Sequence, residues 1–346
     1  MTIAGRSVGP GSSCFVIAEA GVNHDGDRKR ALELVDIAAD AGADAVKFQT
    51  FDADRLATRD APKAEYQLNG TDPAESQHAM LRRLELSGDD HAALMEHCAR
   101  RGIVFLSTPF DEQSADLLAS LGVAAFKTPS GEITNLPYLA HVARYGKPMI
   151  VSTGMATIGE VEAALSAIGD AGGQDVVLLH CVSNYPAAAA TANLRAMATL
   201  ERAFNVPVGY SDHTRGLAIA LAAVALGAAV IEKHVTVDRT LPGPDHHASL
   251  TAAELVALVA SIRDVESALG DGRKRPAPSE LGTAAVARKS IVAAREIRAG
   301  ATITREMIVA LRPGTGISPA LFGAVVGRTT RRDIALGTVL TWDMLG

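Results

Sequence analysis

A repeated strand–loop–helix unit constrains the fold of this chain more than any other feature of its sequence. Between residues 14 and 270, eight short apolar segments each lead into a polar residue and then into an amphipathic helical pattern. The expected strands are 14–18, 45–48, 103–106, 124–127, 149–151, 176–179, 206–209 and 229–231. Eight such units in about 257 residues match the size and strand count of a (β/α)8 TIM barrel in the α/β class.

A doubly wound parallel sheet is the main alternative to the barrel. Such a sheet usually has about five or six strands, and a glycine-rich GxGxxG fingerprint often follows the first strand. The segment after the first expected strand here reads GVNHDGD and lacks that fingerprint. The barrel is therefore the preferred fold.

A second, smaller domain is expected after the barrel. The last barrel helix, 252–269, is followed by a run rich in glycine, proline and charged residues at 270–278. This pattern predicts a catalytic barrel over 1–270, a linker over 271–288 and a small β-rich domain over 289–346. A unit as small as the last buries only about 60% of its unfolded surface, so we expect it to pack against the barrel or a neighbouring subunit.

Charge, cysteine content and hydropathy indicate which partners and which cellular compartment to expect. The formal net charge is −6, and no basic stretch suggests a nucleic-acid partner. The three cysteines have no paired spacing, which favours a reducing compartment without disulfides. No signal peptide is recognisable, and the most apolar stretch, 216–231, is shorter than the roughly 20 residues that a membrane span needs. We expect a soluble, cytoplasmic protein without a membrane partner.

Two histidines follow neighbouring expected strands, in YSDHT (210–214) and EKH (232–234). The carboxyl ends of parallel strands are where barrels and open sheets bind ligands, so His213 and His234 can meet at one metal ion. Two unrelated, hydrogen-bonded histidines are the alternative at this point. Imidazoles together with oxygen donors suit Mn²⁺, Co²⁺, Zn²⁺ or Mg²⁺.

Other polar side chains of the strand ends should gather at the same mouth: Glu19, Lys47, Lys127, Ser130, Glu132, Ser152, Asn184, Ser211 and Glu232. Two lysines among hydroxyl groups suit a phosphate or carboxylate, and a buried Lys47 without an anion would be unfavourable. The carboxylates can orient a hydroxyl-bearing substrate or transfer a proton. Together with a metal that polarises a carbonyl, the set suggests carbon–carbon bond formation between a phosphorylated donor and an aldehyde.

The motifs at these positions resemble the sialic acid synthase family, whose members use phosphoenolpyruvate to make nonulosonic acids. They include IAEAGVNHDGD (17–27), DAVKFQTF (44–51), KTPSGEITNLP (127–137), HCVSNYP (180–186), YSDHT and GPDHHASL (243–250), in this order. The resemblance implies a TIM barrel with a C-terminal antifreeze-like (SAF) domain. It also implies a domain-swapped homodimer, in which RPGTGISP (312–319) reaches the active site of the partner subunit.

The same resemblance implies roles for individual residues. His213 and His234 would hold a divalent metal, Mn²⁺ first and Mg²⁺ or Co²⁺ next, and no organic cofactor is needed. Phosphoenolpyruvate would contact Lys47, Lys127, Ser130, Ser152, Gly154, Asn184 and Ser211. The acylamino sugar would meet Glu19, Tyr185 and Asp245, with Arg312 of the partner subunit at its acyl-amino group. The predicted catalytic residues are Glu19, Glu132, Tyr185 and Glu232.

Several acceptors and functions stay open at this stage. N-acetylmannosamine, which would give N-acetylneuraminate and phosphate, is the first choice. The alternative is a 2,4-diacetamido-trideoxy hexose, which would give N,N'-diacetyllegionaminate. A 6-phosphorylated sugar, a 3-deoxy sugar-phosphate synthase with the same donor, and a non-catalytic carbohydrate- or ice-binding protein are less favoured.

Overall fold

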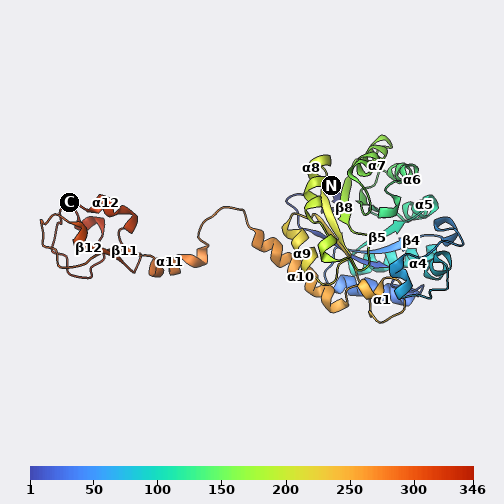
Figure 1. Ribbon diagram of the computed structural model, residues 1–346, viewed down its shortest axis with the longest axis horizontal. Helices are drawn as coiled ribbons and strands as arrows, with labels where there is room; N and C mark the ends of the chain where they lie inside the picture. Colours follow the sequence, from blue (N-terminus) through green and yellow to red (C-terminus); the bar gives the residue numbers. More distant parts are fainter. The chain divides into compact units, whose positions relative to one another are not determined.

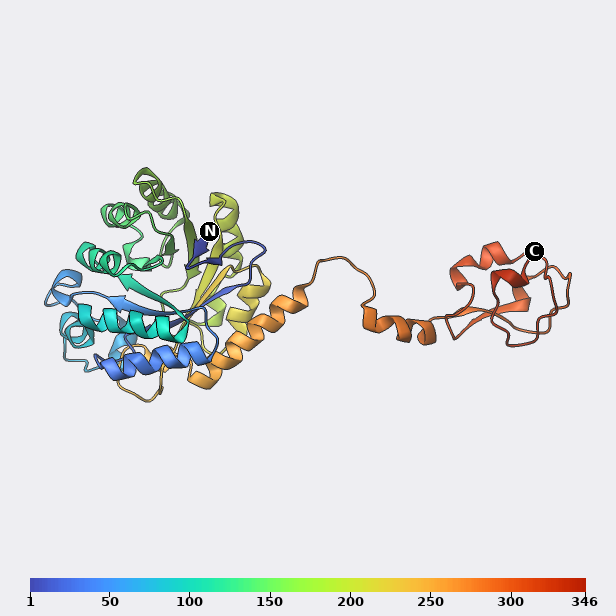
Figure 2. The same cartoon turned by 180° about the vertical axis from the view of Figure 1, so that it is seen from behind.

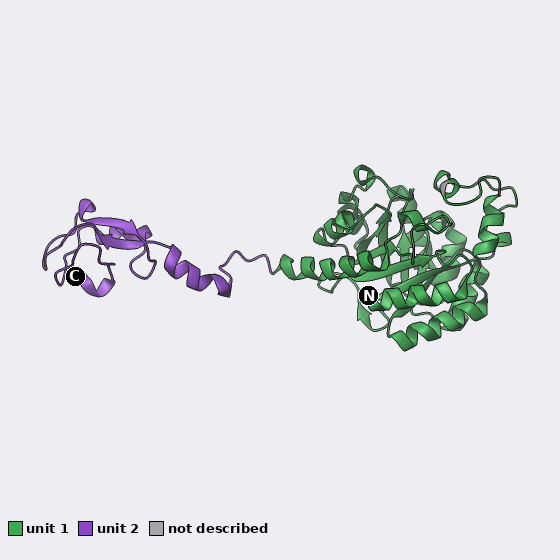
Figure 3. Ribbon diagram, turned by 90° about the horizontal axis from the view of Figure 1, so that it is seen from below, with its two compact units in different colours: residues 1–270 green, residues 271–346 purple. Residues whose placement is uncertain are grey.

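The computed structural model describes residues 1–346, apart from the side chain of Asn69, and it divides into two compact units (Figure 3). The first unit comprises residues 1–270 and the second residues 271–346. Each unit has a hydrophobic core of its own.

The first unit is a barrel of eight parallel strands, which confirms the predicted fold class. Its strands are β3 (Phe15–Gly21), β4 (Ala45–Thr50), β5 (Val104–Pro109), β6 (Phe126–Thr128), β7 (Met149–Ser152), β8 (Val176–Cys181), β9 (Val208–Asp212) and β10 (Val230–His234). The hydrogen-bonded order is β5-β4-β3-β10-β9-β8-β7-β6. The two end strands, β5 and β6, contact each other and close the ring.

Helices surround the strands on the outside, as Figures 1 and 2 show from opposite sides. They are α1 (Arg28–Asp40), α4 (Gly88–Arg101), α5 (Glu112–Leu121), α6 (Leu136–Ala143), α7 (Ile158–Asp170), α8 (Arg195–Phe204), α9 (Ala218–Ala225) and α10 (Ala252–Leu269). The local sequence determines where several of these helices begin. Thr157 and Glu160 form a capping box at the amino end of α7, as Ser87 and Asp90 do at α4. The main core lies between this helical layer and the outer faces of the strands.

A second apolar cluster fills the barrel interior at the amino ends of its strands. Phe15, Ile17, Ala45 and Leu106 belong to it, together with Ile3 of a short amino-terminal hairpin. The hairpin pairs β1 (Thr2–Ile3) with β2 (Arg6–Ser7). The interior is thus packed at one end, which leaves only the carboxyl ends of the strands available for a site.

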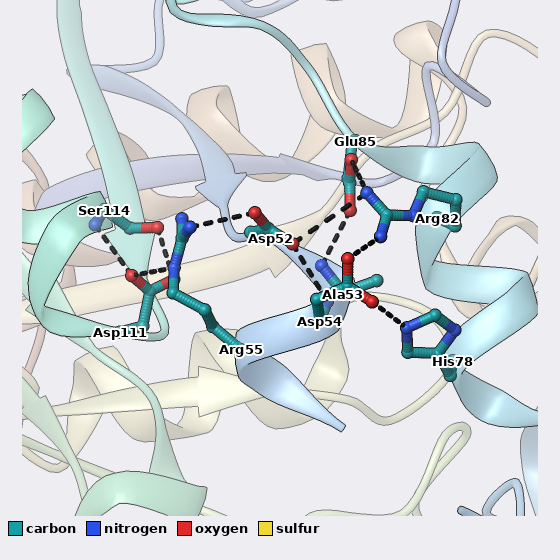
Figure 4. A network of polar contacts seen from close by, with 9 residues as sticks. All are labelled: Asp52, Ala53, Asp54, Arg55, His78, Arg82, Glu85, Asp111 and Ser114. Atoms are coloured by element: carbon teal, nitrogen blue, oxygen red, sulfur yellow. Dashed lines mark hydrogen bonds and ion pairs between the residues drawn. The ribbon is translucent and has the colours of Figure 1, made fainter. Parts of the chain in front are cut away.

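The segment between β4 and α4, residues 51–87, contains three short helices and is called the lid below. They are α2 (Ala53–Leu56), the 3₁₀ helix η1 (Glu65–Asn69) and α3 (Gln77–Leu84). Figure 4 shows the polar network that joins α2 to α3 and to the start of α5. Asp54 accepts from His78 at 2.8 Å and pairs with Arg82, while Arg55 lies 2.9 Å from Asp111.

The second unit has its own small core beneath short strands and turns. A two-stranded antiparallel sheet joins β11 (Ser290–Ala293) to β12 (Ile308–Leu311). The short helices are η5 (Pro278–Glu280), α11 (Leu281–Ala287), η6 (Arg305–Met307), η7 (Pro319–Leu321), α12 (Phe322–Val325) and η8 (Trp342–Met344). No helix in the part of the chain that the structure describes is both long and apolar enough to span a membrane.

Candidate active site

Side-chain alternation along the strands places the candidate site inside the barrel mouth. Successive residues of a strand point to opposite faces, so the interior face of β3 carries Phe15, Ile17 and Glu19 in turn. The same face of β4 passes from Ala45 to Lys47. The interior therefore changes from apolar to charged along each strand, and the charged end lines a cavity of about 390 Å³.

A buried cluster of four charged groups lies at the base of this cavity. The Lys47 ammonium lies 2.7 Å from the carboxylate of Glu19 and 3.8 Å from that of Glu232. Lys127 lies 3.8 Å from the other oxygen of Glu232. Each of the four side chains is at most 6% exposed, so water screens their interactions very little.

The two carboxylates of the cluster differ in their protonation. Burial raises the pKa of Glu19 to about 7, even though Lys47 acts in the opposite direction. Burial also acts to raise the pKa of Glu232, but Lys127 and Lys47 outweigh it, and that pKa lies below its usual range. Glu19 can therefore carry a proton near neutral pH, while Glu232 stays charged.

Hydroxyl groups and one backbone amide surround the lysines. Lys127 donates to Ser152 Oγ at 2.7 Å, and Ser211 Oγ donates to Glu232 at 3.0 Å. Ser130 Oγ accepts from the backbone amide of Gly154 at 3.0 Å. A side chain at Gly154 would come within 2.7 Å of that same hydroxyl, which explains why the position has none. Cations, hydroxyls and an amide together make a suitable cradle for an anion.

The two predicted metal-ligating histidines lie side by side in the same cavity, with ring centroids 5.6 Å apart. Nδ1 of His213 donates to the carbonyl oxygen of Val182 at 2.7 Å. The proton of the neutral ring is therefore on Nδ1, and the lone pair of Nε2 is available to another partner. Nδ1 of His234 is buried without a hydrogen-bond partner among the described residues. Burial lowers the pKa of both imidazoles, so both are neutral at pH 7, as metal ligands must be.

This arrangement fits a divalent ion, but it supplies few protein ligands. Asp245 lies 3.8 Å from His234 Nδ1, and burial raises its pKa to about 6. Within residues 1–346 as described, no group of three or more His, Cys, Asp and Glu residues is arranged to hold a metal. Two nitrogens with open positions suit an ion that also binds substrate oxygens.

An ion pair on the outer face of the strands braces the two histidines. Lys233 donates to Asp212 at 2.7 Å and to the carbonyl oxygen of Thr214 at 2.6 Å. Asp212 also accepts from the amide and hydroxyl of Thr214. Because Asp212 precedes His213 and Lys233 precedes His234, this pair holds together the two strand ends that carry the imidazoles. Sequence reasoning quoted these residues in motifs but assigned them no role.

The 3₁₀ helix η1 covers part of the cavity. Tyr66 packs on Tyr185 with ring centroids 4.7 Å apart, and Tyr185 packs on His213 at 4.0 Å. Gly70, just after η1, accepts a backbone hydrogen bond from Gly243 at 2.9 Å, and a Cβ at Gly70 would overlap the Gly243 carbonyl. Sequence analysis did not assign Tyr66 to the site, because the turn-rich segment 49–88 offers no strand end that would position it.

The structure brings most of the predicted site residues to this cavity. Its lining contains Glu19, Lys47, Lys127, Ser130, Ser152, Tyr185, Ser211, His213, Glu232, His234 and Asp245. Glu132 lies outside the lining and accepts from Asn135 at 2.6 Å, and Asn184 is exposed outside it. Gly154 contacts the lining through Ser130. Arg312 belongs to the second unit, where its Nε donates to the carbonyl oxygen of Ala287 at 2.9 Å.

Comparison with known proteins places the chain in a family. The NeuB family model matches residues 34–274, and the SAF domain model matches residues 288–346. The chain belongs to the NeuB family. The predicted resemblance is confirmed, and so is the prediction that the protein is an enzyme, a transferase that forms carbon–carbon bonds.

Two curated relatives and one solved structure are close to this NeuB-family chain. The N,N'-diacetyllegionaminic acid synthase of Legionella pneumophila is 50% identical over 339 residues, covering 97% of this chain and 95% of the relative. The synthase of the same name from Campylobacter jejuni is 48% identical over 321 residues, covering 92% and 96%. A crystal structure of the N-acetylneuraminic acid synthetase from Leptospira borgpetersenii, in complex with citrate, has a TM-score of 0.72 at 36% identity, covering 82% of this chain and 94% of that one.

Proposed function

We propose that this NeuB-family enzyme condenses phosphoenolpyruvate with the open-chain form of a 2,4-diacetamido-trideoxy hexose. The products would be phosphate and a nine-carbon 2-keto-3-deoxy acid of the legionaminate type. The observation that carries the reaction is the buried cluster of Glu19, Lys47, Glu232 and Lys127, next to two imidazoles in one cavity. The names of the two curated relatives support the acceptor.

The lysine-rich part of the cavity would hold the donor. The ammonium groups of Lys47 and Lys127 would pair with the phosphate and carboxylate of phosphoenolpyruvate, and the hydroxyls of Ser130, Ser152 and Ser211 would direct its oxygens. Gly154 and Asn184 would complete this contact from the loops. The two ammonium groups would then pair with the bound anions and with Glu232 at the same time.

The carboxylates divide the remaining chemistry. C3 of phosphoenolpyruvate attacks the aldehyde carbon, and protonated Glu19 donates its proton to the aldehyde oxygen. Water adds at C2, and the proton that it loses restores Glu19. Phosphate leaves with the remaining hydroxyl proton as its bond to C2 breaks, which creates the 2-keto group. Charged Glu232 stabilises the positive charge that develops at C2.

A metal and a partner subunit would complete the site. A divalent ion, Mn²⁺ first and Mg²⁺ or Co²⁺ next, would be held by His213 and His234 and supplies a Lewis acid toward the aldehyde oxygen when bound. Tyr185 and Asp245 would contact the sugar. Arg312 would reach the acyl-amino group from the second subunit of a domain-swapped homodimer. A cytoplasmic location and a catalytic role for Glu132 stay predictions.

N-acetylmannosamine, the first choice from sequence alone, is now the second candidate. The solved synthetase at 36% identity supports it, whereas the relatives at 50% and 48% identity support the diacetamido sugar. The deciding experiment measures phosphate release from phosphoenolpyruvate with Mn²⁺, comparing the diacetamido sugar, N-acetylmannosamine and its 6-phosphate, with EDTA as control. We expect turnover chiefly with the diacetamido sugar. Folded, metal-loaded protein that turns over none of the three would contradict the proposal.

A further inference from the structure

The residues that line the active-site cavity divide into two chemical sets. The strand ends supply the charged and hydroxyl groups described above. The lid and its neighbours supply six apolar side chains, which we call the apolar wall: Val22, Leu56, Met80, Leu81, Leu84 and Phe110. Nothing in the chemistry of the donor or the metal requires this wall, so its role needs a separate explanation.

Helical spacing aims one face of α3 at the cavity. Gln77, Met80, Leu81 and Leu84 follow at i, i+3, i+4 and i+7, so they share one face of the helix. All four line the cavity. The side chain of Ser76 accepts from the amide of Ala79 and fixes where α3 begins. The stripe therefore presents one side-chain amide followed by apolar surface.

Burial shows which parts of the wall can reach a ligand. Val22, Met80 and Leu84 are at most 5% exposed and form the packed layer behind it. Leu56, Leu81 and Phe110 are only half-buried. Phe51 holds the ring of Phe110 edge to face, with centroids 6.0 Å apart. The open surface of the wall thus belongs to three firmly supported side chains.

Two side-chain amides lie beside this apolar surface. Gln67 and Gln77 both line the cavity, and Gln77 Nε2 donates to Gln67 Oε1 at 3.3 Å. That hydrogen bond uses one of the two N–H groups of Gln77. An acetamido group needs a donor, an acceptor and a small apolar site for its methyl group, and the stripe on α3 offers this combination.

We propose that the apolar wall binds the methyl groups of the acceptor, namely an acetamido methyl and the methyl group of its deoxy carbon C6. This inference rests on the proposed function and deepens it, because it assigns the preference for the diacetamido sugar to particular residues. N-acetylmannosamine carries one hydroxyl group on C4 and another on C6. In the trideoxy sugar, C4 carries an acetamido group instead, and C6 is itself a methyl group. Hydroxyl groups held against the apolar wall would lose water without gaining a hydrogen bond.

The test substitutes the wall and compares two acceptors on the full-length enzyme. In Leu81→Asn we expect the ratio of kcat/KM for the diacetamido sugar to kcat/KM for N-acetylmannosamine to fall by about 10- to 100-fold. Leu81→Met keeps an apolar side chain of similar volume and should keep the ratio. Leu226→Asn, at an exposed leucine after α9, is the matched control and should leave both substrates unaffected.

A binding measurement separates this inference from the proposed function. Saturation-transfer NMR on unmodified enzyme should give its strongest signals at the acceptor methyl groups, and Leu81→Asn should weaken those signals. An unchanged ratio and unchanged methyl signals in folded Leu81→Asn would overturn the inference alone and make the wall no more than the core of the lid. If Leu81→Asn fails to fold, Leu56→Asn and Leu81→Ala carry the same prediction. Unmodified enzyme that prefers N-acetylmannosamine would overturn the proposed acceptor, and the role of the wall with it.

Discussion

The carboxylate of Glu19 lies 2.7 Å from the ammonium group of Lys47, and both side chains are at most 4% exposed. The pair joins neighbouring strands, because Glu19 and Lys47 stand opposite each other in the register of β3 and β4. Burial nevertheless raises the pKa of Glu19 to about 7. The pair therefore holds a carboxyl group in position while leaving it able to exchange a proton near neutral pH.

Replacing Glu19 should remove a proton-transfer group and its signature in the pH profile. Because the reaction uses protonated Glu19, kcat of the unmodified enzyme should fall as the pH rises through about 7. Glu19→Gln should lower kcat by about 100- to 10,000-fold and abolish this decline. Steady-state kinetics over a range of roughly pH 5.5 to 9 test both effects.

Glu162→Gln is the matched control for Glu19→Gln, since Glu162 lies exposed on α7 away from the cavity. It should leave both kcat and the pH profile unchanged. A Glu19→Gln enzyme that keeps the decline near pH 7 would assign that decline to another group.

Strand ends show how far sequence could predict the site. Apolar runs predicted strands ending at Ala18 and Ile231, whereas β3 continues to Gly21 and β10 to His234. The strands extend further because the charged residues at their ends compensate one another inside the barrel, so they need not leave the sheet. Hydrophobicity locates the strands, but mutual charge compensation sets where they end.

Residues beyond the strands were harder to place from sequence. Glu132 lies in the 3₁₀ turn η2 (Ser130–Glu132), where the two-residue alternation of the strand no longer applies, and its carboxylate turns to Asn135. Tyr66 reaches the cavity only because η1 folds back over Tyr185. The helical spacing of Gln77, Met80, Leu81 and Leu84 was readable in the sequence, but the cavity that it faces was not.

Removing one lysine should weaken the donor site selectively. Lys127→Met leaves Glu232 without one of its two cations and removes the hydrogen bond to Ser152. We expect kcat/KM for phosphoenolpyruvate to fall about 100- to 1000-fold while the KM for the acceptor changes little. Lys147→Met, at an exposed position, is the control. Equal losses for both substrates would contradict a donor-specific role for Lys127.

Breaking the outer brace should destabilise the barrel. Lys233→Met leaves the carboxylate of Asp212 buried without its cation, and we expect the free energy of unfolding in urea to fall by about 3–5 kcal/mol. Lys233→Met combined with Asp212→Asn should lose less than the sum of the two single changes. Arg100→Met, at an exposed pair with Glu96, should change stability by less than about 1 kcal/mol. Strictly additive effects would show that the pair is not coupled.

Each histidine of the pair should be needed for metal binding. His213→Ala and His234→Ala should each abolish tight binding of Mn²⁺, followed by electron paramagnetic resonance, while circular dichroism shows an unchanged fold. His141→Ala, whose imidazole pairs with Asp116 outside the cavity, should bind like the unmodified protein. Tight Mn²⁺ binding that survives both substitutions would remove the two histidines from the proposed ligand set.

Mixing two impaired variants, assayed at a sugar concentration far below the raised KM of Arg312→Ala, should reveal whether Arg312 serves the site of a partner subunit. Lys127→Met inactivates its own barrel but keeps Arg312, whereas Arg312→Ala keeps an intact barrel. In a domain-swapped dimer of the two, the barrel with Lys127 receives a functional Arg312 from its partner. Random reassociation after mixing should then restore roughly a quarter of the unmodified activity, since about half of the dimers are mixed and each has one complete site.

The loss of Arg312 should affect the KM for the acceptor sugar more than the KM for the donor. Arg312→Ala alone should raise the KM for the sugar and leave the KM for phosphoenolpyruvate nearly unchanged, because Arg312 is assigned to the acyl-amino group. Arg298→Ala changes another exposed arginine of the same unit and is the control. This variant should be active by itself, without mixing with a second variant. If Arg312 acted within its own subunit, no mixture of the two variants would regain activity, since neither chain would then hold a complete site.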